Sequence, residues 1–438
     1  MDTQGFDQRV FRGAAGALPA IVMLQGELSV LTLYQGATPW LQALAEYAAA
    51  GYLPAAVSPV NRQQPYGVLR EFDGVLLRHA PLRTAPDDRR PPVSVIVTAC
   101  GDSAALRACL HALAPQCHAA QAELLLVINT APQALADAAR AALEQRCDRL
   151  LFEPRPGKSH ALNSAVRAAR GAVLAFTDDD AKPAPHWLAA LTQPLLDPHR
   201  DPLLVGCGGP VEPIYPTQGV PAWLPALLDA HPTHFLTPKH HLGTAATDYL
   251  PREGGLAHVP LGANCAYRRE VFEAYHYDTE LGPNRVTGLR GGEDYLLGQL
   301  LIRDGYRLRY LPQAQVAHPV DPARLSRRHV DRAFYMHGVE WVRIWQALGW
   351  DGNPLHTSRA RTWRKLWKAR WRLLRARLPG AQVDADDLLV WRMRHARRRG
   401  MLAELRRQRL LAGARRLDDP GTGSLDLSRW QPWRRGRH

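Results

Sequence analysis

Three adjacent aspartates, Asp178, Asp179 and Asp180, end an apolar run in the stretch AVLAFTDDDAKPAPHWL. Like charges at the tip of a buried strand repel one another unless a cation or hydrogen bonds compensate them. Alternate residues of an extended segment point to the same side, so Asp178 and Asp180 project together. Their carboxylates would suit a hard divalent cation such as Mg²⁺ or Mn²⁺. The alternative is a solvated acidic turn in which an aspartate caps the next helix.

A second acidic pair, Glu293 and Asp294, follows two glycines in the segment GGEDYLLGQLLIRDGYRLRYLPQAQVAHPV. The pattern predicts a helix that begins at the pair, followed by a strand that ends near His318. The two carboxylates could serve acid–base chemistry. They could also simply complement the positive end of the helix dipole.

The elements that would position these residues alternate regularly. Short apolar runs predict buried strands at 93–100, 122–129 and 172–177, and helical patterns follow at 103–116, 133–146 and 159–171. Gly171 is placed to stop the last of these helices. Continuous apolar strands that alternate with helices favour a parallel α/β sheet covered on both faces. Ligands of such sheets bind beyond the carboxyl ends of the strands, where Asp178–Asp180 stand.

Charge and composition divide the chain. Residues 321–438 hold 28 Lys and Arg against 11 Asp and Glu, a net charge of +17, whereas residues 1–320 carry −3. We expect a small N-terminal α/β module at 1–86, a polar linker at 87–91, a catalytic domain at 92–340 and a basic, Trp-rich helical region at 341–438.

The chain shows no targeting pattern. The N-terminal MDTQGFDQRV lacks the basic and apolar regions of a signal peptide, and no apolar run reaches the roughly 20 residues that span a bilayer. The six cysteines include no CxxC pair and no metal-ligand spacing. We therefore expect reduced thiols and a cytoplasmic location. A peripheral position on the inner face of the cytoplasmic membrane is expected from the basic C-terminal helix described below.

The segment EPRPGKSHALNSAV, upstream of the aspartates, opens a helix with Arg155 and Lys158 available to phosphates. Its GKS is not a P-loop, because Phe152 stands where that motif requires a glycine. Together with PPVSVIVTA, FTDDD, GANCAYRR, GGED and AQVAHPVDPARLSRRHVDRAFYMHG, this segment resembles the family 2 glycosyltransferases of GT-A fold, in the family's order, over roughly residues 92–340.

The resemblance implies metal-dependent transfer of a sugar, with inversion, from a nucleoside diphosphate sugar, a UDP-sugar being favoured. Asp178 and Asp180 match the ends of the DXD motif, with Asp180 as the direct ligand of Mn²⁺ or Mg²⁺ and Asp178 at the metal or the ribose. Asp179 is counted with the donor contacts. Asp294 matches the catalytic base, with Glu293 beside it. The chemistry needs a charge-neutralised leaving group and a carboxylate that deprotonates the acceptor hydroxyl.

Some positions depart from the family pattern. Ile128 stands where the second strand usually ends in an aspartate that pairs with the donor base, so Asn129 or another residue must make that contact. The first strand ends in TACGD, in which Thr98, Ala99 and Asp102 are the candidate nucleotide contacts. Asn163 of the helix is retained, whereas Leu162 replaces the common arginine. The Gln-x-x-Arg-Trp segment and membrane helices of processive members are missing, so non-processive addition is expected.

Histidines offer two further hypotheses. In several GT-A enzymes a histidine after the last core strand reaches the metal, and His318 stands at that place, although such a histidine is often structural. The sequence HPTHFLTPKHH has irregular spacing, and we interpret it as part of an acceptor-side loop rather than a metal site.

The basic region contains SRARTWRKLWKARWRLLRARL, in which Trp363, Trp367 and Trp371 recur every four residues. Helical geometry puts them with Leu366, Leu374 and Leu378 on one side and six Arg and Lys on the other. Such a helix at 359–378 suits a membrane surface and a lipid-linked or cell-envelope glycan acceptor. Alternatively, the Trp stripe packs on the catalytic domain.

A function of another class is also compatible with the sequence. Basic residues with interleaved aromatics could bind nucleic acid, and the DXD-like site would then be vestigial or serve nucleotidyl transfer. The net charge of −3 on residues 1–320 argues against a broad nucleic-acid surface.

Overall fold

The computed structural model describes residues 7–14, 16–18, 21, 23–29, 38–63, 68–78, 91–221, 233–234, 239–251, 256–349, 359–376 and 385–417. The chain divides into two compact units, Met1–Asp87 and Asp88–His438. The boundary falls at the start of the expected linker, and the basic C-terminal helices belong to the second unit. The division of the chain into four parts stays a prediction.

The first unit is an antiparallel sheet with helices. Its strands β1 (Met23–Ser29), β2 (Tyr52–Gln63) and β3 (Val68–Arg78) lie in the order β1-β3-β2. The helices α1 (Asp7–Gly13) and α2 (Trp40–Ala49) complete the unit. Its core combines aromatic and aliphatic side chains, namely Phe11, Leu24, Leu28, Ala43, Tyr47, Tyr52 and Leu76. The described part of this unit therefore combines helices and a sheet, while the expected domain at 1–86 stays a prediction.

The second unit is built on a mixed sheet. In the described part of the chain it has eight strands in the order β13-β15-β9-β14-β7-β4-β5-β6. The strands are β4 (Val93–Ala99), β5 (Glu123–Ile128), β6 (Arg149–Phe152), β7 (Val173–Asp178), β9 (Leu204–Gly208), β13 (Thr247–Asp248), β14 (Cys265–Arg268) and β15 (Arg307–Tyr310). The strands β7, β4, β5 and β6 run parallel, as the continuous apolar runs predict. Strand β14 pairs antiparallel with both β7 and β9, which those runs do not predict.

Helices cover this sheet, and two of them, α5 and α9, begin at residues of the candidate site described below. They are α3 (Ala104–Ala119), α4 (Asp137–Glu144), α5 (Lys158–Ala168), α6 (Trp187–Leu196), α8 (Val271–Ala274) and α9 (Glu293–Arg303). Ser103 caps α3 by accepting the Leu106 N–H at 3.0 Å. Leu106, Leu110 and Leu113 of α3 are buried against the apolar strands. The predicted α/β class is therefore confirmed.

A smaller sheet lies beside the strand tips, in the order β11-β12-β10-β16-β8. Its strands are β8 (Lys182–Pro183), β10 (Val211–Ile214), β11 (Thr233–His234), β12 (Lys239–His240) and β16 (Val316–Pro319). Strand β16 pairs antiparallel with β8, which follows the three aspartates in the chain. This pairing brings His318 next to Asp178 and Asp180.

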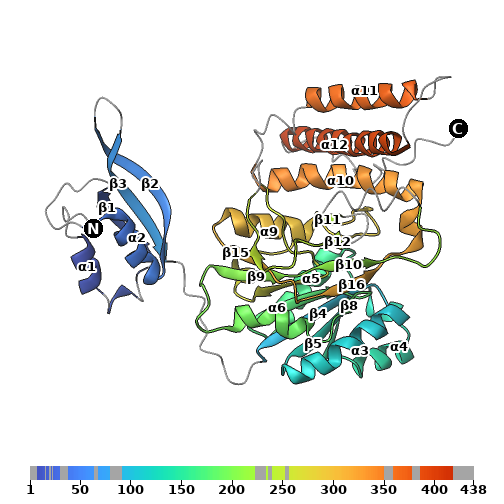
Figure 1. Cartoon of the computed structure of the whole chain (residues 1–438), viewed down its shortest axis with the longest axis horizontal. Helices are drawn as coiled ribbons and strands as arrows, with labels where there is room; N and C mark the ends of the chain where they lie inside the picture. Colours follow the sequence, from blue (N-terminus) through green and yellow to red (C-terminus); the bar gives the residue numbers. More distant parts are fainter. Residues whose placement is uncertain are drawn as a thin grey trace. The chain divides into compact units, whose positions relative to one another are not determined.

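The C-terminal helices form layers on the second unit. Figure 1 shows α10 (Arg327–Ala347), α12 (Ala385–Leu417) and α11 (Arg359–Arg375) stacked in that order away from the sheet. Helix α12 packs on both of the others. Gly338 and Gly400 allow α10 and α12 to approach closely, because an added Cβ would meet the carbonyl oxygens of Arg397 and Tyr335, respectively. No helix in the described ranges is long and apolar enough to cross a membrane.

Two sequence predictions need correction. The helix predicted to stop at Gly171 ends at Ala168, and Gly171 serves a different purpose. A Cβ at Gly171 would lie 2.3 Å from the Ser94 backbone nitrogen, so the glycine permits the chain to pass close to β4.

The second correction concerns α11. The buried side of this helix is formed by Thr362, Leu366 and Ala369. Trp363, Trp367 and Trp371 are exposed by 42%, 55% and 59%, respectively. The prediction that these tryptophans share a face with Leu366 is wrong, and so is the alternative in which they pack on the catalytic domain. Leu378 lies outside the described residues.

The buried side chain of Asn264 connects three segments near the strand tips through hydrogen bonds. Asn264, which is fully buried, donates through Nδ2 to the carbonyl oxygens of Pro210 at 2.9 Å and Ala314 at 2.6 Å. Its Oδ1 accepts the Trp187 Nε1–H at 2.8 Å. The GANC segment therefore holds the start of α6 and the ends of β9 and β15 in place, since all of these buried polar groups are satisfied at once.

We expect Asn264→Ala to lower the free energy of unfolding by about 3 kcal/mol, because it leaves two buried carbonyls and one indole N–H without partners. Urea denaturation measures this loss. The exposed Gln313→Ala serves as the control and should change stability by less than about 0.5 kcal/mol. A loss of less than about 1 kcal/mol in Asn264→Ala would contradict the role assigned to this side chain.

Candidate active site

The candidate site lies where the carboxyl ends of β4 and β7 meet. Thr98 and Asp178 are neighbours at the ends of these parallel strands. Four further elements reach the same place: the β7–β8 turn, the first residue of α5, the start of α9 and strand β16. They contribute the side chains of Asp180, Lys158, Glu293, Asp294 and His318.

Asp178, Asp180 and His318 form one group. His318 Nε2 lies 3.4 Å from Asp178 Oδ2 and 3.1 Å from Asp180 Oδ1. The opposite ring nitrogen, Nδ1, lies 2.9 Å from the Pro319 carbonyl oxygen, which can only accept a hydrogen bond. That bond places a proton on Nδ1 and turns Nε2 toward the carboxylates. The three side chains offer ligand atoms within 4.8 Å of one another, and they are the possible metal-binding group among the residues that the structure describes.

Charge compensation at this group follows from burial and partners. Burial raises the pKa of Asp178, but the charges of Lys158 and His318 outweigh it and hold the pKa below its ordinary value. Burial, followed by the charges of Asp178 and Asp180, raises the pKa of Asp179 to about 6. Burial lowers the pKa of His318, but the hydrogen bond and charge of Asp178 raise it overall. Burial and the neighbouring carboxylates therefore act together on Asp179, whereas Lys158 and His318 compensate the charge of Asp178.

Lys158 connects the two acidic groups. Its Nζ donates to Asp178 Oδ1, and the side chain is only 17% exposed. Burial lowers the pKa of Lys158, but the charges of Asp178, Glu293 and Asp294 raise it above its ordinary value. This lysine is the cation that lets carboxylates from β7 and α9 share one buried site.

Glu293 and Asp294 form the other group. Asp294 Oδ2 accepts the Gly262 N–H and Oδ1 accepts the Tyr295 N–H, both at 2.7 Å. Glu293 is 3% exposed, and its Oε2 has no hydrogen-bond partner in the described part of the chain. Burial and the neighbouring Asp294 raise the pKa of Glu293 to about 8. Burial also raises the pKa of Asp294, but the Gly262 N–H opposes that shift. The pair therefore favours one proton on Glu293 and the charge on Asp294.

The other predicted nucleotide contacts lie around this site, and two of them already have partners. Thr98 and Ala99 end β4 and are buried. Asp102 lies just beyond and pairs with Arg107 through two hydrogen bonds of 2.9 Å. Arg155 is exposed and binds Glu153.

The two predicted asparagines hold backbone. Asn129 donates to the carbonyl oxygens of Glu153 and Arg155 at 2.9 and 2.7 Å, and it accepts the Gly157 N–H at 2.9 Å. Asn163 exchanges two hydrogen bonds with the backbone of Tyr277, at 2.8 and 3.0 Å. Their amides therefore support the walls of the site.

The histidines of the segment HPTHFLTPKHH differ in how far the structure describes them and in their surroundings. His231 lies outside the described residues, and the structure describes no more than the backbone of His234. His240 is buried and lies 3.0 Å from the Tyr249 hydroxyl, while His241 lies 2.7 Å from Glu212. Burial lowers the pKa of His240 to about 3, so its ring is neutral.

Sequence reasoning missed the partners that come from distant segments. The Gly262 N–H belongs to the GANC segment, but nothing in that motif reveals that it binds Asp294. Glu340 was missed as well, although it accepts the backbone N–H groups of Arg290 and Gly291, just before α9. Its signal was present: a carboxylate stands among the apolar residues of α10.

The arrangement separates two chemical tasks. Asp178, Asp180 and His318 offer two carboxylates and an imidazole nitrogen, a set that divalent transition ions accept. Asp294, which belongs to a separate element, the helix α9, can accept a proton. Lys158 lies between them and stabilises negative charge.

Comparison with known proteins gives a family match and similar solved structures. A family model described as Glycosyltransferase like family 2 matches residues 91–333. Among solved structures, GalNAc-T7 with UDP, GalNAc and Mn²⁺ is similar, with a TM-score of 0.41 and 18% identity; the match covers 70% of this chain and 55% of that chain. Glucosyl-3-phosphoglycerate synthase of M. tuberculosis is similar with a TM-score of 0.37 and 19% identity, and the match covers 60% of this chain and 82% of that chain. No curated protein matches the chain.

Glu293 generates a prediction about pH. In the folded state it keeps its proton up to a pKa of about 8, whereas the ordinary glutamate value is 4.5. The folded state therefore binds this proton more tightly, and its stability falls as the pH rises from the unfolded pKa through the folded one. In Glu293→Gln this titration is removed, so its free energy of unfolding should fall less between about pH 5 and pH 8, by about 1 kcal/mol or more.

Urea denaturation at several pH values measures this difference. Parallel stability curves for Glu293→Gln and the parent protein would show that Glu293 is ionised in the folded state, and would contradict the assignment of the proton.

Proposed function

The chain belongs to the glycosyltransferase-like family 2, and on this premise we propose that it transfers a sugar from a nucleoside diphosphate sugar to an acceptor hydroxyl, with inversion. The observation that carries the proposal is that two acidic groups lie at one edge of the sheet. Asp178 and Asp180 form the first group, and Glu293 and Asp294 form the second. Lys158 lies between the two groups. Sugar transfer requires one group beside the leaving diphosphate and the other beside the attacking hydroxyl.

Asp178, Asp180 and His318 fit a divalent cation. Asp180 is the direct ligand: it stands at the open end of the group, and among the described residues its carboxylate lies 3.1 Å from His318 Nε2. His318 is held in the tautomer that a metal ligand requires by its bond to Pro319. Bound Mn²⁺ or Mg²⁺ would neutralise the diphosphate leaving group. Lys158 adds a fixed positive charge at the same place.

Asp294 is the base. Two backbone N–H groups fix the direction of its carboxylate. The acceptor oxygen bonds to the anomeric carbon as the bond to the diphosphate breaks, and its proton passes to Asp294. Attack on the side opposite the diphosphate inverts the configuration of that carbon. Glu293 retains its own proton and leaves the negative charge on Asp294.

Nucleotide contacts come from the end of β4 and the residues that follow. Thr98, Ala99 and Asp102 contact the nucleotide, and Arg155, Lys158 and Asp179 face its phosphates and sugar. Ile128 is fully buried, so no polar side chain at that position reaches the base. A UDP-sugar remains the favoured donor. Asn129 and Asn163 shape the site through the backbone they hold.

Asp180→Asn and Asp294→Asn test the division of tasks. We expect Asp180→Asn to weaken Mn²⁺-dependent binding of the nucleoside diphosphate about tenfold or more, because it removes a charged ligand. We expect Asp294→Asn to lower kcat by about 10²-fold or more while donor binding changes less than about threefold, because it removes only the base. Thermal shift with a panel of nucleoside diphosphates, with and without Mn²⁺, measures binding, and sugar transfer measures kcat.

The exposed Asp137→Asn, on α4, is the control for both variants. Equal metal-dependent nucleotide binding by Asp180→Asn and the parent protein would remove Asp180 from the metal site. Full activity of Asp294→Asn would exclude it as the base.

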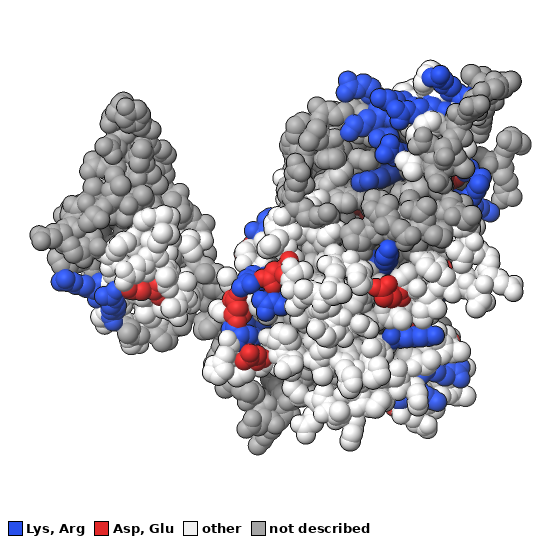
Figure 2. Space-filling model, in the orientation of Figure 1, with Lys and Arg blue, Asp and Glu red and all other residues white. Residues whose placement is uncertain are grey.

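The exposed face of α11 supports an acceptor at a membrane surface. Trp363, Trp367, Trp371 and Leu374 lie at helical spacing and are all more than 40% exposed. Arg370 lies over the Trp367 ring at 5.3 Å and Arg375 over the Trp371 ring at 5.4 Å. Figure 2 shows Lys and Arg gathered over the C-terminal helices. Tryptophans beside cations suit the headgroup region of an anionic bilayer, so the acceptor is a lipid-linked or cell-envelope glycan. The protein is then peripheral on the inner face of the cytoplasmic membrane.

Replacement of all three α11 tryptophans by alanine tests this surface. We expect co-sedimentation with vesicles of anionic and neutral phosphatidyl lipids to fall about tenfold or more, because the apolar contact is lost. The matched control is Leu250→Ala, which removes an exposed apolar side chain, 67% accessible, from the segment that follows β13. Undiminished vesicle binding by the triple variant, or binding to duplex DNA alone, would reject the membrane contact; the latter would favour nucleic acid instead.

A further inference from the structure

Residues 278–291 form a loop, here called the strap, that contacts the start of α5 and directly precedes α9. The Ser159 hydroxyl donates to the Leu281 carbonyl oxygen at 2.9 Å, and the Lys158 N–H donates to that of Pro283 at 2.9 Å. Asn284 Nδ2 donates to the Pro156 carbonyl oxygen at 2.8 Å. The strap therefore fixes the backbone from which the Lys158 side chain reaches Asp178.

The strap also borders the carboxylates of α9. A Cβ at Gly282 would lie 3.4 Å from the carboxyl carbon of Glu293. The Gly282 N–H donates to the Gly291 carbonyl oxygen at 3.1 Å, which closes the strap just before Glu293. The position of this segment thus bears on both acidic groups at once.

Helix α10 holds the strap at both ends. Near the beginning of the strap, Arg343 Nη1 donates to the backbone oxygen of Glu280 and lies 3.4 Å from the Glu280 carboxylate. At its end, Glu340 Oε1 accepts the N–H groups of Arg290 at 2.7 Å and Gly291 at 3.2 Å. Residues 340 and 343 lie on the same side of the helix.

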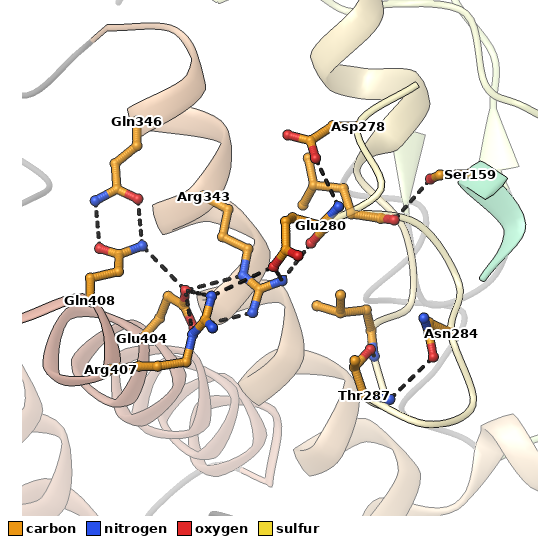
Figure 3. Close-up of polar contacts among 12 residues, drawn as sticks. Ser159, Asp278, Glu280, Asn284, Thr287, Arg343, Gln346, Glu404, Arg407 and Gln408 are labelled. Atoms are coloured by element: carbon orange, nitrogen blue, oxygen red, sulfur yellow. Dashed lines mark hydrogen bonds and ion pairs between the residues drawn. The ribbon is translucent and has the colours of Figure 1, made fainter. Parts of the chain in front are cut away.

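Helix α12 supports this hold from behind. Glu404, only 2% exposed, accepts Arg343 Nε at 3.1 Å, Arg407 Nη2 at 3.1 Å and Gln408 Nε2 at 3.2 Å. Figure 3 shows Glu404 between the two arginines, and Arg343 reaching from Glu404 toward the Glu280 end of the strap. A buried carboxylate with this many donors fixes the plane of the Arg343 guanidinium.

We propose that Arg343 and Glu404 are positioning residues through which helix α12 holds the strap, and with it Lys158 and the carboxylates of α9. The C-terminal helices are then a part of the catalytic machinery, in addition to carrying the α11 face. The effect on turnover rests on the proposed sugar transfer, whereas the hold on the strap does not.

Hydrogen exchange and kinetics of Arg343→Met and Glu404→Gln test the proposal on the full chain. The control is Arg392→Met, which breaks another α10–α12 ion pair, of 2.7 Å to Asp331, away from the strap. Arg343→Met should speed amide exchange about tenfold or more in peptides covering 278–291 and 156–162. Its kcat should fall about tenfold or more, while the donor KM changes less than about threefold, because misplaced groups slow chemistry more than binding.

Glu404→Gln keeps the size of the side chain and one acceptor oxygen, so it should fold and show the same changes at smaller size. Adding it to Arg343→Met should have a smaller effect than Glu404→Gln alone, since both residues act in one network, in which Arg407 also binds Glu404 and lies 3.7 Å from Glu280. Exchange at 278–291 and 156–162 that matches the Arg392→Met control would overturn the proposal. Faster strap exchange with an unchanged 156–162 segment would also overturn it. A parent protein without sugar transfer would refute the proposed function, and the exchange data would still decide the role of Arg343.

Discussion

The compensation of buried carboxylates at one sheet edge is the constraint on which the rest of the site depends. Asp178, Glu293 and Asp294 come from segments more than 100 residues apart, and each would be costly to bury alone. Lys158 approaches all three, and it does so because α5 begins at that residue, where Gly157 has a φ of 129° that favours glycine. The short connection before α5 therefore has to be rigid. Asn129 and the 278–291 strap supply that rigidity from two different sides.

Polar groups that hold backbone recur around the site. Asn129, Asn163 and Asn264 each bind two or three main-chain or indole groups from distant segments. An amide side chain suits this purpose because it donates and accepts at once and carries no charge into the interior. The consequence is that loops reaching the strand tips are tied to distant backbone, which preorganises the charged side chains they carry.

Local pattern was sufficient for the parts of the fold and site that local chemistry determines. Strands β4, β5 and β7 were predicted within about one residue, because their apolar runs are continuous and bounded by polar turns. Asp178 and Asp180 were predicted to project together from the alternation of side chains in an extended segment; the structure places both beside His318, although Asp180 lies in the turn after β7. The antiparallel β14 escaped prediction because its four residues carry no signal for strand direction. Gly171 and the α11 tryptophans were misassigned because close backbone approach and helix burial depend on what lies opposite, which periodicity does not encode.

The partners of the α9 carboxylates were beyond prediction for a related reason. The GGED motif contains the acid pair, but the groups that orient it are the Gly262 N–H, Glu340 and, through the strap, Arg343. Each is contributed across a sequence gap that no spacing rule bridges. The DXD side is more local, because its strand, turn and β8 are contiguous, although Lys158 and His318 come from other segments. The donor side of the site is therefore largely a local structure, while the acceptor side is assembled by α10 and α12. Changes in the C-terminal helices should accordingly alter the geometry of the α9 carboxylates and of Lys158, which the strap holds, before they alter the turn that carries Asp180.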